Sequence, residues 1–240
     1  MPESSAAVQE RPVSPTSQLP STYRTEVESL DKALLSSRPD ATHPKPGMYM
    51  VNLDMGRNVR EHPGAVIWDI GSRSGAHLYK LRSMYGDFVQ QYAGINPVAL
   101  PLPEDLAKTP AEEQIPIFQG YMEQLGDPKL QEQAKKKGVW PPTMMLLNNV
   151  LKYPLQYLQE EGLNNALQTM LDVLSPKGVM LIYEDTGQNL YPKYEEALHH
   201  LAQKGINTKI ERRPGNGRYP FYLHVTKEPQ TTGDPGPTSA

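Results

Sequence analysis

Residues 65–81 read AVIWDIGSRSGAHLYKL, and this stretch decides the fold that the sequence predicts. Within it, Val66, Ile67, Trp68 and, after Asp69, Ile70 are apolar, a pattern that predicts a short buried strand over residues 66–70. Gly71 and Gly75 then predict a turn, because glycine adopts backbone conformations that let the chain double back. From His77 onward the apolar residues have helical spacing. A strand, a glycine turn and a helix in this order place the turn at the carboxyl edge of a parallel sheet, where the first amides of the helix can bind a ligand.

The acid at the end of this strand, Asp69, limits the kind of ligand expected there. A carboxylate accepts hydrogen bonds and repels anions, so it suits hydroxyl or amine groups better than phosphate. We therefore expect a nucleoside-like ligand with no pyrophosphate over this turn. An ordinary strand-to-helix turn of an α/β domain remains an alternative, because short glycine motifs also occur without a ligand.

The composition fits one folded domain with tails. The chain has 240 residues, of which 38% are hydrophobic and 21% charged, enough for one core. A net charge of −3 and the lack of a long basic run argue against a nucleic acid partner. The absence of cysteine excludes disulfides and cysteine nucleophiles and is compatible with a reducing compartment. Because no segment is as apolar as a signal sequence or a membrane span, we expect a cytoplasmic protein that does not bind membranes.

The two ends of the chain differ from its middle. Residues 1–21 are rich in Ser, Pro, Gln and Ala, and residues 228–240 in Pro, Gly and Thr, so both are expected to be disordered tails. Residues 22–62 form a predicted cap segment, with an amphipathic helix at 25–35. The main domain is expected over residues 63–227.

Six further apolar segments predict strands at residues 88–95, 115–118, 144–147, 179–183, 208–211 and 221–226. The segment 144–147 is continuously apolar, which is typical of a central parallel strand buried on both faces. Two helices are predicted at 163–174 and 195–204, and Gly205 is expected to end the second.

The turn after the first strand resembles motif I of class I S-adenosylmethionine-dependent methyltransferases, which is usually written (D/E)xGxGxG. Asp69, Gly71 and Gly75 match this motif, whereas Arg73 stands where the middle glycine usually lies. An arginine there can point outward, contact the methionine carboxylate or crowd the ligand.

Two later segments strengthen this resemblance. Asn148, Asn149, Val150 and Leu151 resemble the residues after the family's fourth strand, and SPKG at 175–178 resembles its LPGG turn. The resemblance covers about residues 63–227. It implies an α/β fold, namely a Rossmann-like three-layer sandwich with a seven-stranded, mostly parallel sheet and an antiparallel last strand.

The resemblance also implies S-adenosyl-L-methionine as the cofactor and in-line transfer of its methyl group to a small molecule. The cofactor-binding residues that it implies are Asp69, Gly71, Ser72, Arg73, Gly75, Asn96, Tyr121, Met122, Asn148 and Asn149. Lys152, Tyr153 and Asp185 fall where catalytic or substrate-facing side chains commonly lie in the family.

Besides Arg73, Asn96 and Tyr121 also depart from the family pattern. Asn96 ends the second predicted strand, where many members have an acid that accepts from the ribose hydroxyls, and a neutral amide weakens that contact by about 1 kcal/mol. Glu104 and Asp105 are alternative acids if the strand ends later. The missing acid also argues against NAD. Tyr121 and Met122 can stack on adenine or can be ordinary core residues.

Two other functions remain open from the sequence, a non-catalytic binding or regulatory protein with this fold and a protein methyltransferase. Fold alone does not decide among them. The histidines at 77, 199, 200 and 224 are expected on helix surfaces or in the core. No group of residues has convincing metal-ligand spacing, so no metal is predicted.

Overall fold

The computed structural model describes residues 21–25, 56–98, 102, 104–184, 190–215 and 221–228. Most of both predicted tails, nearly all of the predicted helix at 25–35 and the predicted catalytic residue Asp185 lie outside the described residues. The domain boundaries given above therefore stay predictions.

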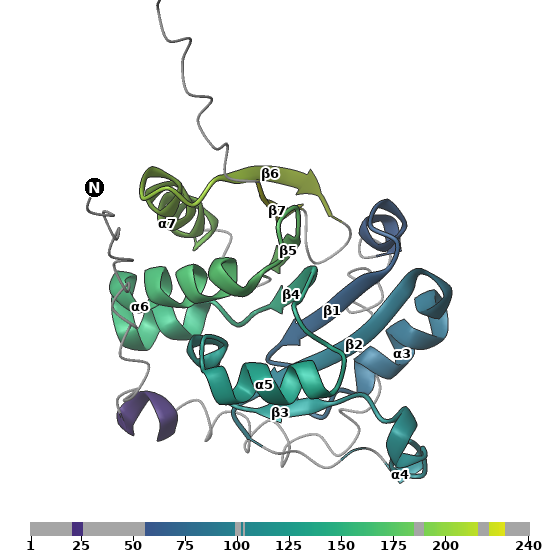
Figure 1. Ribbon diagram of the computed structural model, residues 1–240. Coiled ribbons are helices and arrows are strands. Elements are labelled where there is room, and N and C mark those ends of the chain that lie inside the picture. The colour runs from purple at the N-terminus through teal and green to yellow at the C-terminus, as the bar shows by residue number, and fades with distance from the viewer. Residues whose placement is uncertain are drawn as a thin grey trace, which may run out of the picture.

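Seven strands form one sheet in the order β3-β2-β1-β4-β5-β7-β6 (Figure 1). Strand β7 runs antiparallel to both of its neighbours, whereas the pairs among β1 to β5 are parallel. This arrangement confirms the predicted sheet with its antiparallel last strand. The strands are β1 (Ala65–Ile70), β2 (Val89–Asn96), β3 (Ile117–Gln119), β4 (Met144–Asn148), β5 (Val179–Tyr183), β6 (Thr208–Pro214) and β7 (Phe221–Lys227).

Helices cover both faces of the sheet, which confirms the three-layer sandwich. Buried residues of α5, α6 and α7 form a core with one face, and buried residues of α3 and the helical segment 56–61 form a core with the other (Figure 1). The helices are α3 (Ala76–Tyr85), α4 (Glu104–Ala107), α5 (Pro128–Lys136), α6 (Lys152–Val173) and α7 (Tyr191–Gln203). In the part of the chain that the structure describes, no helix combines the length and apolarity needed to cross a bilayer.

The alternation of side chains along each central strand explains the two cores. In β1, Trp68 and Ile70 face the core under α5 to α7, whereas Ala65 and Ile67 face the core under α3. Successive side chains of a strand point to opposite faces, so a strand covered on both sides must be apolar at nearly every position. Asp69 is the one charged residue in β1, and it comes immediately before the last residue of the strand.

Trp68 fixes β1 against the loop that leads into β4. Its indole nitrogen donates a hydrogen bond of 2.7 Å to the carbonyl of Val139. The indole also stacks on Phe118 with ring centroids 5.3 Å apart and meets the ring of Trp140 edge-on at 5.7 Å. Because Trp68 directly precedes Asp69, these contacts also hold the acid at the end of the strand.

Two helices begin earlier than the sequence predicts. Helix α6 starts at Lys152 and is interrupted at Gln159, whose φ of 59° is not helical, so the predicted helix at 163–174 is only its second part. Helix α7 starts at Tyr191 rather than at residue 195, and Tyr191 and Tyr194 are both fully buried. Aromatic residues beside a proline gave a weak helical pattern, although proline is well tolerated in the first turn of a helix.

Candidate active site

The turn after β1 needs glycine at both predicted positions. Gly71 and Gly75 have positive φ angles of 77° and 75°. A Cβ atom on Gly71 would lie 2.6 Å from Cγ1 of Val150, and one on Gly75 would lie 2.6 Å from Cδ1 of Ile117. Backbone conformation and close packing therefore both exclude larger residues, since side chains rarely adopt these φ angles and a Cβ atom would collide with its neighbour.

Arg73 and Asn96 bind each other at the tip of this turn. The backbone amide of Arg73, whose φ is 54°, donates to Oδ1 of Asn96 at 3.1 Å. Asn96 is 1% exposed, and its Nδ2 donates to the carbonyl of Val98 at 2.9 Å. The Arg73 side chain is exposed. In this conformation the Asn96 amide holds the turn to β2, and its predicted contact with a ribose stays a prediction.

Asp69 contacts a histidine that the sequence did not assign to the site. Oδ2 of Asp69 lies 3.1 Å from Nε2 of His77, the second residue of α3. Burial lowers the pKa of the His77 imidazole, but the charge and contact of the Asp69 carboxylate raise that pKa, and the net result lies above the ordinary value. A helical side chain leans toward the amino terminus of its helix, which explains how His77 reaches back across the turn.

Several polar groups at this turn are buried without a full set of hydrogen bonds. Among the described residues, Oγ of Ser72 and Oδ2 of Asp69 are buried and have no hydrogen-bond partner, apart from the His77 contact of Asp69. Helix α3 has no side-chain cap at Gly75 and no acid in its first turn. Since the first amides of a helix lack intrahelical partners, this end of α3 can bind an anionic group.

A second acid, Glu123, lies in a cluster of tyrosines after β3. Its Oε1 accepts a 3.0 Å hydrogen bond from the hydroxyl of Tyr23, which belongs to the helical segment 21–25. The ring of Tyr23 lies 5.8 Å from that of Tyr121 and 6.3 Å from that of Tyr157, measured between centroids. The predicted residues Tyr121 and Met122 are both buried here. The sequence offered no sign of Glu123, because its partner lies 100 residues away.

Burial makes Glu123 a weaker acid than an ordinary glutamate. Burial raises the pKa of its carboxyl group above the ordinary value, and the hydrogen bonds from its own backbone and from Tyr23 only partly oppose this effect. Oε2 of Glu123 is buried and has no hydrogen-bond partner among the described residues. This oxygen can accept a hydrogen bond from an amine of a ligand.

The residues after β4 lie at the same edge as Asp69, because β1 and β4 are parallel neighbours with Ile70 opposite Leu147. Asn149 has a φ of 58°, and its Nδ2 donates to Oδ1 of Asn148 at 3.0 Å. The Nζ atom of Lys152 lies 5.3 Å from the centre of the Tyr153 ring.

Not every predicted site residue can be placed. Asp185 lies outside the described residues, as do the side chains of Glu104 and Asp105. The residue before Asp185 is Glu184, which directly follows β5 and is 1% exposed. It interacts with Tyr194, whose pKa is raised by burial and by this carboxylate.

One hollow of the structure does not belong to this edge. It is a groove of about 660 Å³ between α6 and α7, lined in part by Asn164, Glu196 and His200. None of the predicted site residues lines it, so it does not bear on the candidate active site.

The fold is that of class I S-adenosylmethionine-dependent methyltransferases, as comparison with solved structures shows. The N-methyltransferase NodS from Bradyrhizobium japonicum WM9, solved with S-adenosyl-L-homocysteine, matches with a TM-score of 0.56 and 14% identity, over 85% of this chain and 98% of NodS. The plantazolicin methyltransferase BpumL, solved with SAH and a pentazolic desmethylPZN analogue, matches with a TM-score of 0.54 and 14% identity, over 87% of this chain and 96% of BpumL. No protein-family model and no curated protein matches the sequence.

Proposed function

We propose that this chain binds S-adenosyl-L-methionine at the turn after β1 and transfers its methyl group to a small-molecule acceptor. The observation that carries the proposal is the group of buried, incompletely bonded oxygens of Asp69 and Ser72 beside the uncapped start of α3. Buried polar atoms in proteins nearly always have partners, so their presence at a turn that requires two glycines favours a ligand there. The fold, shared with two methyltransferases, is consistent with this ligand.

The side chains at this edge fit the two ends of the cofactor. The first amides of α3 suit a carboxylate, and Asp69 suits an ammonium group, so together they suit the amino acid end. Tyr121 and Met122 offer aromatic and polarizable surface for a purine, and Glu123 can accept from its amine. Asn96 offers a weaker partner, because its amide already bonds to Arg73 and Val98.

The remaining predicted residues act on the acceptor. S-adenosyl-L-methionine supplies an electrophilic methyl group, so the protein must hold a nucleophile in line with it and accept a proton where the nucleophile carries one. We assign these tasks to Lys152 and Tyr153, which follow β4, and to Asp185, which comes two residues after the last residue of β5 in the sequence.

Calorimetric titration of the full chain with S-adenosyl-L-methionine and with S-adenosyl-L-homocysteine tests the proposal. We expect micromolar binding that weakens by about tenfold or more in Asp69→Asn, because a charged hydrogen bond to the ligand ammonium is lost. Asp87→Asn is the matched control, since Asp87 is exposed and follows α3 at the opposite edge of the sheet. No heat at millimolar ligand, in protein with an unchanged circular dichroism spectrum, would refute the proposal.

A second candidate is a binding or regulatory protein that keeps this fold without catalysis. The state of Asn96 favours it, because an amide that bonds to the turn cannot also accept both ribose hydroxyls. This candidate predicts that S-adenosyl-L-methionine does not bind and that no methyl group is transferred in a metabolite screen. The first candidate predicts cofactor binding and methyl transfer. The same screen with protein acceptors tests the protein methyltransferase alternative.

A further inference from the structure

A separate group of polar side chains lies under the helical segment 56–61. His224 in β7 is 3% exposed, and neither of its ring nitrogens has a hydrogen-bond partner among the described residues. Its strand neighbours Leu223 and Val225 face the core under α7, so His224 faces the other side of the sheet. A buried imidazole with two unbonded nitrogens is rare in proteins and calls for a ligand.

Two more candidate ligands meet His224 from the end of the segment 56–61. Glu61, His62 and His224 each offer one oxygen or nitrogen atom, and these three atoms all lie within 4.8 Å of one another. In a tetrahedral zinc site, bonds of about 2.0–2.1 Å place the ligand atoms about 3.3 Å apart. To bind one ion, the ligand atoms must therefore come closer together by about 1.5 Å at most. Rotation of the side chains of the exposed Glu61 and the half-buried His62 can supply this movement.

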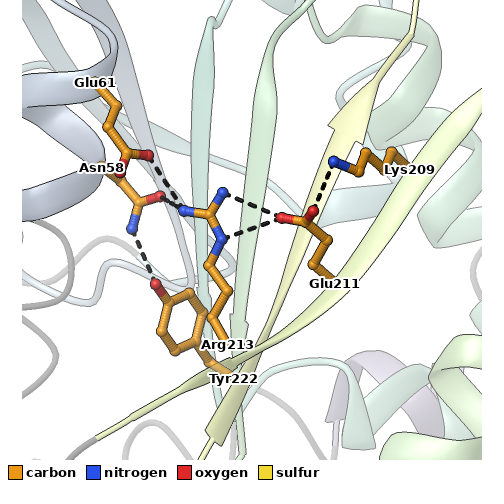
Figure 2. Close-up of polar contacts among 6 residues, drawn as sticks. All are labelled: Asn58, Glu61, Lys209, Glu211, Arg213 and Tyr222. Carbon is orange, nitrogen blue, oxygen red and sulfur yellow. Dashed lines mark hydrogen bonds and ion pairs between the residues drawn. The ribbon is translucent and has the colours of Figure 1, made fainter.

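Arg213 binds one of the two oxygens of the Glu61 carboxylate (Figure 2). Nη1 of Arg213 donates to Oε2 of Glu61 and to Oδ1 of Asn58, both at 3.2 Å. Nε and Nη2 of the same guanidinium donate to Oε2 of Glu211 at 3.3 and 3.2 Å. Glu211 thus balances the charge of Arg213, and the second oxygen of Glu61 can bind a cation while the first keeps its bond to Arg213.

Two further contacts connect the residues around Arg213 to the sheet (Figure 2). Nδ2 of Asn58 donates to the hydroxyl of Tyr222 at 3.2 Å, and Nζ of Lys209 lies 2.6 Å from Oε1 of Glu211. The segment before β1 is therefore held to β6 and β7 by polar groups around the three candidate ligands. Such supporting bonds orient the ligands in known metal sites.

We propose that Glu61, His62 and His224 form a binding site for a divalent transition metal ion, with Zn²⁺ as the best match. Two imidazoles and one carboxylate are donors typical of zinc sites with three protein ligands and a bound water. Magnesium and calcium prefer sites made of oxygen atoms alone. The metal ion connects Glu61 and His62 to β7. Its three ligands are not among the candidate active-site residues, so metal binding does not depend on methyl transfer.

Titration of the full chain, stripped of metal with a chelator, with ZnCl₂ in a calorimeter tests this site. We expect one equivalent of Zn²⁺ to bind and to raise the thermal midpoint of unfolding, because the ion binds the folded chain. His62→Ala should weaken binding by about tenfold or more and reduce the thermal shift at the same zinc concentration. His62 is half-buried, so this variant should fold, whereas His224→Asn serves as a second test if it folds.

The double variant His199→Ala/His200→Ala is the matched control, because these two histidines are neighbours on the exposed side of α7 and can attract zinc adventitiously. Unchanged affinity for the single equivalent in this control, together with weaker binding in His62→Ala, supports the site. Binding that disappears with the exposed pair, binding that His62→Ala leaves unchanged, or no binding at millimolar Zn²⁺ would each overturn it. Excess Mg²⁺ should not displace the bound zinc.

Discussion

Oδ2 of Asp69 lies 3.1 Å from Nε2 of His77, and these two residues stand on either side of the turn that forms the candidate active site. The contact joins the end of β1 to the first turn of α3, so it stabilises the turn. It also places a titratable imidazole where the proposed ligand ammonium would bind. Asp69 therefore has two competing partners, one in the protein and one in the ligand.

Replacing His77 by glutamine should lower stability in a pH-dependent way. Because Asp69 raises the pKa of His77 in the folded state, the contribution of His77 is fully present below its unfolded value of 6.5 and is lost as the pH rises through the raised pKa. We expect His77→Gln to lower the free energy of unfolding by about 2 kcal/mol near pH 6 and by less at pH 9. Urea denaturation at several pH values measures this difference, with the exposed His199→Gln as control. A difference that stays constant with pH would contradict the pairing.

Alanine at Gly71 should be more damaging than alanine at another glycine of the same backbone conformation. Gly71 and Gly64 have φ angles of 77° and 78°, but only the Cβ atom at position 71 would collide, with Val150, since nothing lies within 4 Å of one at position 64. We expect Gly64→Ala to cost about 1 kcal/mol and Gly71→Ala about 3 kcal/mol.

The double variant Gly71→Ala/Val150→Ala separates the two causes. Val150→Ala removes the Cγ1 atom that would collide with the new Cβ atom. The double variant should therefore lose less stability than the sum of the losses of the two single variants. Thermal and urea denaturation measure each term. Equal losses for Gly71→Ala and Gly64→Ala would show that only backbone strain matters at this turn.

Glutamine at position 123 should stabilise the free protein and weaken its proposed ligand binding. The raised pKa of Glu123 means that its stabilising contribution is complete below its unfolded value of 4.5 and is lost as the pH rises toward the folded value. Glu123→Gln is therefore expected to match the wild type near pH 4.5 and to exceed it by about 1 kcal/mol above neutral pH, because no charge is buried. The exposed Glu112→Gln is the control, and titration with S-adenosyl-L-methionine should show weaker binding only in Glu123→Gln.

Removing the hydroxyl of Tyr23 should loosen the segment 21–25. This hydroxyl donates to a carboxylate that is nine-tenths buried, so Tyr23→Phe leaves the acid without its donor and should cost about 2 kcal/mol. A double-mutant cycle with Glu123→Gln should give a coupling energy of about 1 kcal/mol. Tyr157→Phe is a suitable control, because its ring packs on Tyr23 in the same cluster. Additive effects of Tyr23→Phe and Glu123→Gln would show that the bond contributes nothing.

The central strands could be predicted from the sequence because their pattern is local. Strand β5 covers residues 179–183 as predicted, and β1 and β4 differ from prediction by one residue, since burial on both faces requires continuous apolarity. Strands β6 and β7 run further than predicted, to Pro214 and Lys227, because pairing between them continues where the side-chain pattern no longer indicates a strand.

The turn of the candidate site could be predicted because one short segment, residues 69–75, carries it. Gly71 and Gly75 predict the turn because glycine adopts backbone conformations that other residues rarely adopt. Asp69 is recognisable as a candidate site residue because it is the one acid in an apolar strand. The contact of Asp69 with His77 was not predicted, because it depends on the direction in which a helical side chain leans. Glu123 was not predicted either, because its partner Tyr23 lies 100 residues earlier in the sequence. The approach of His62 to His224 likewise follows from the sheet order, which no local spacing encodes.

The position of Trp68 gives this protein a built-in optical reporter. The chain has two tryptophans, and the second, Trp140, lies against the first with ring centroids 5.7 Å apart. All indole emission therefore originates from one spot, a single residue before Asp69. Quenching or a spectral shift of this emission on adding a nucleoside would reveal occupancy of the neighbouring turn in unlabelled protein, so ligand screening can proceed before any methyl acceptor has been identified.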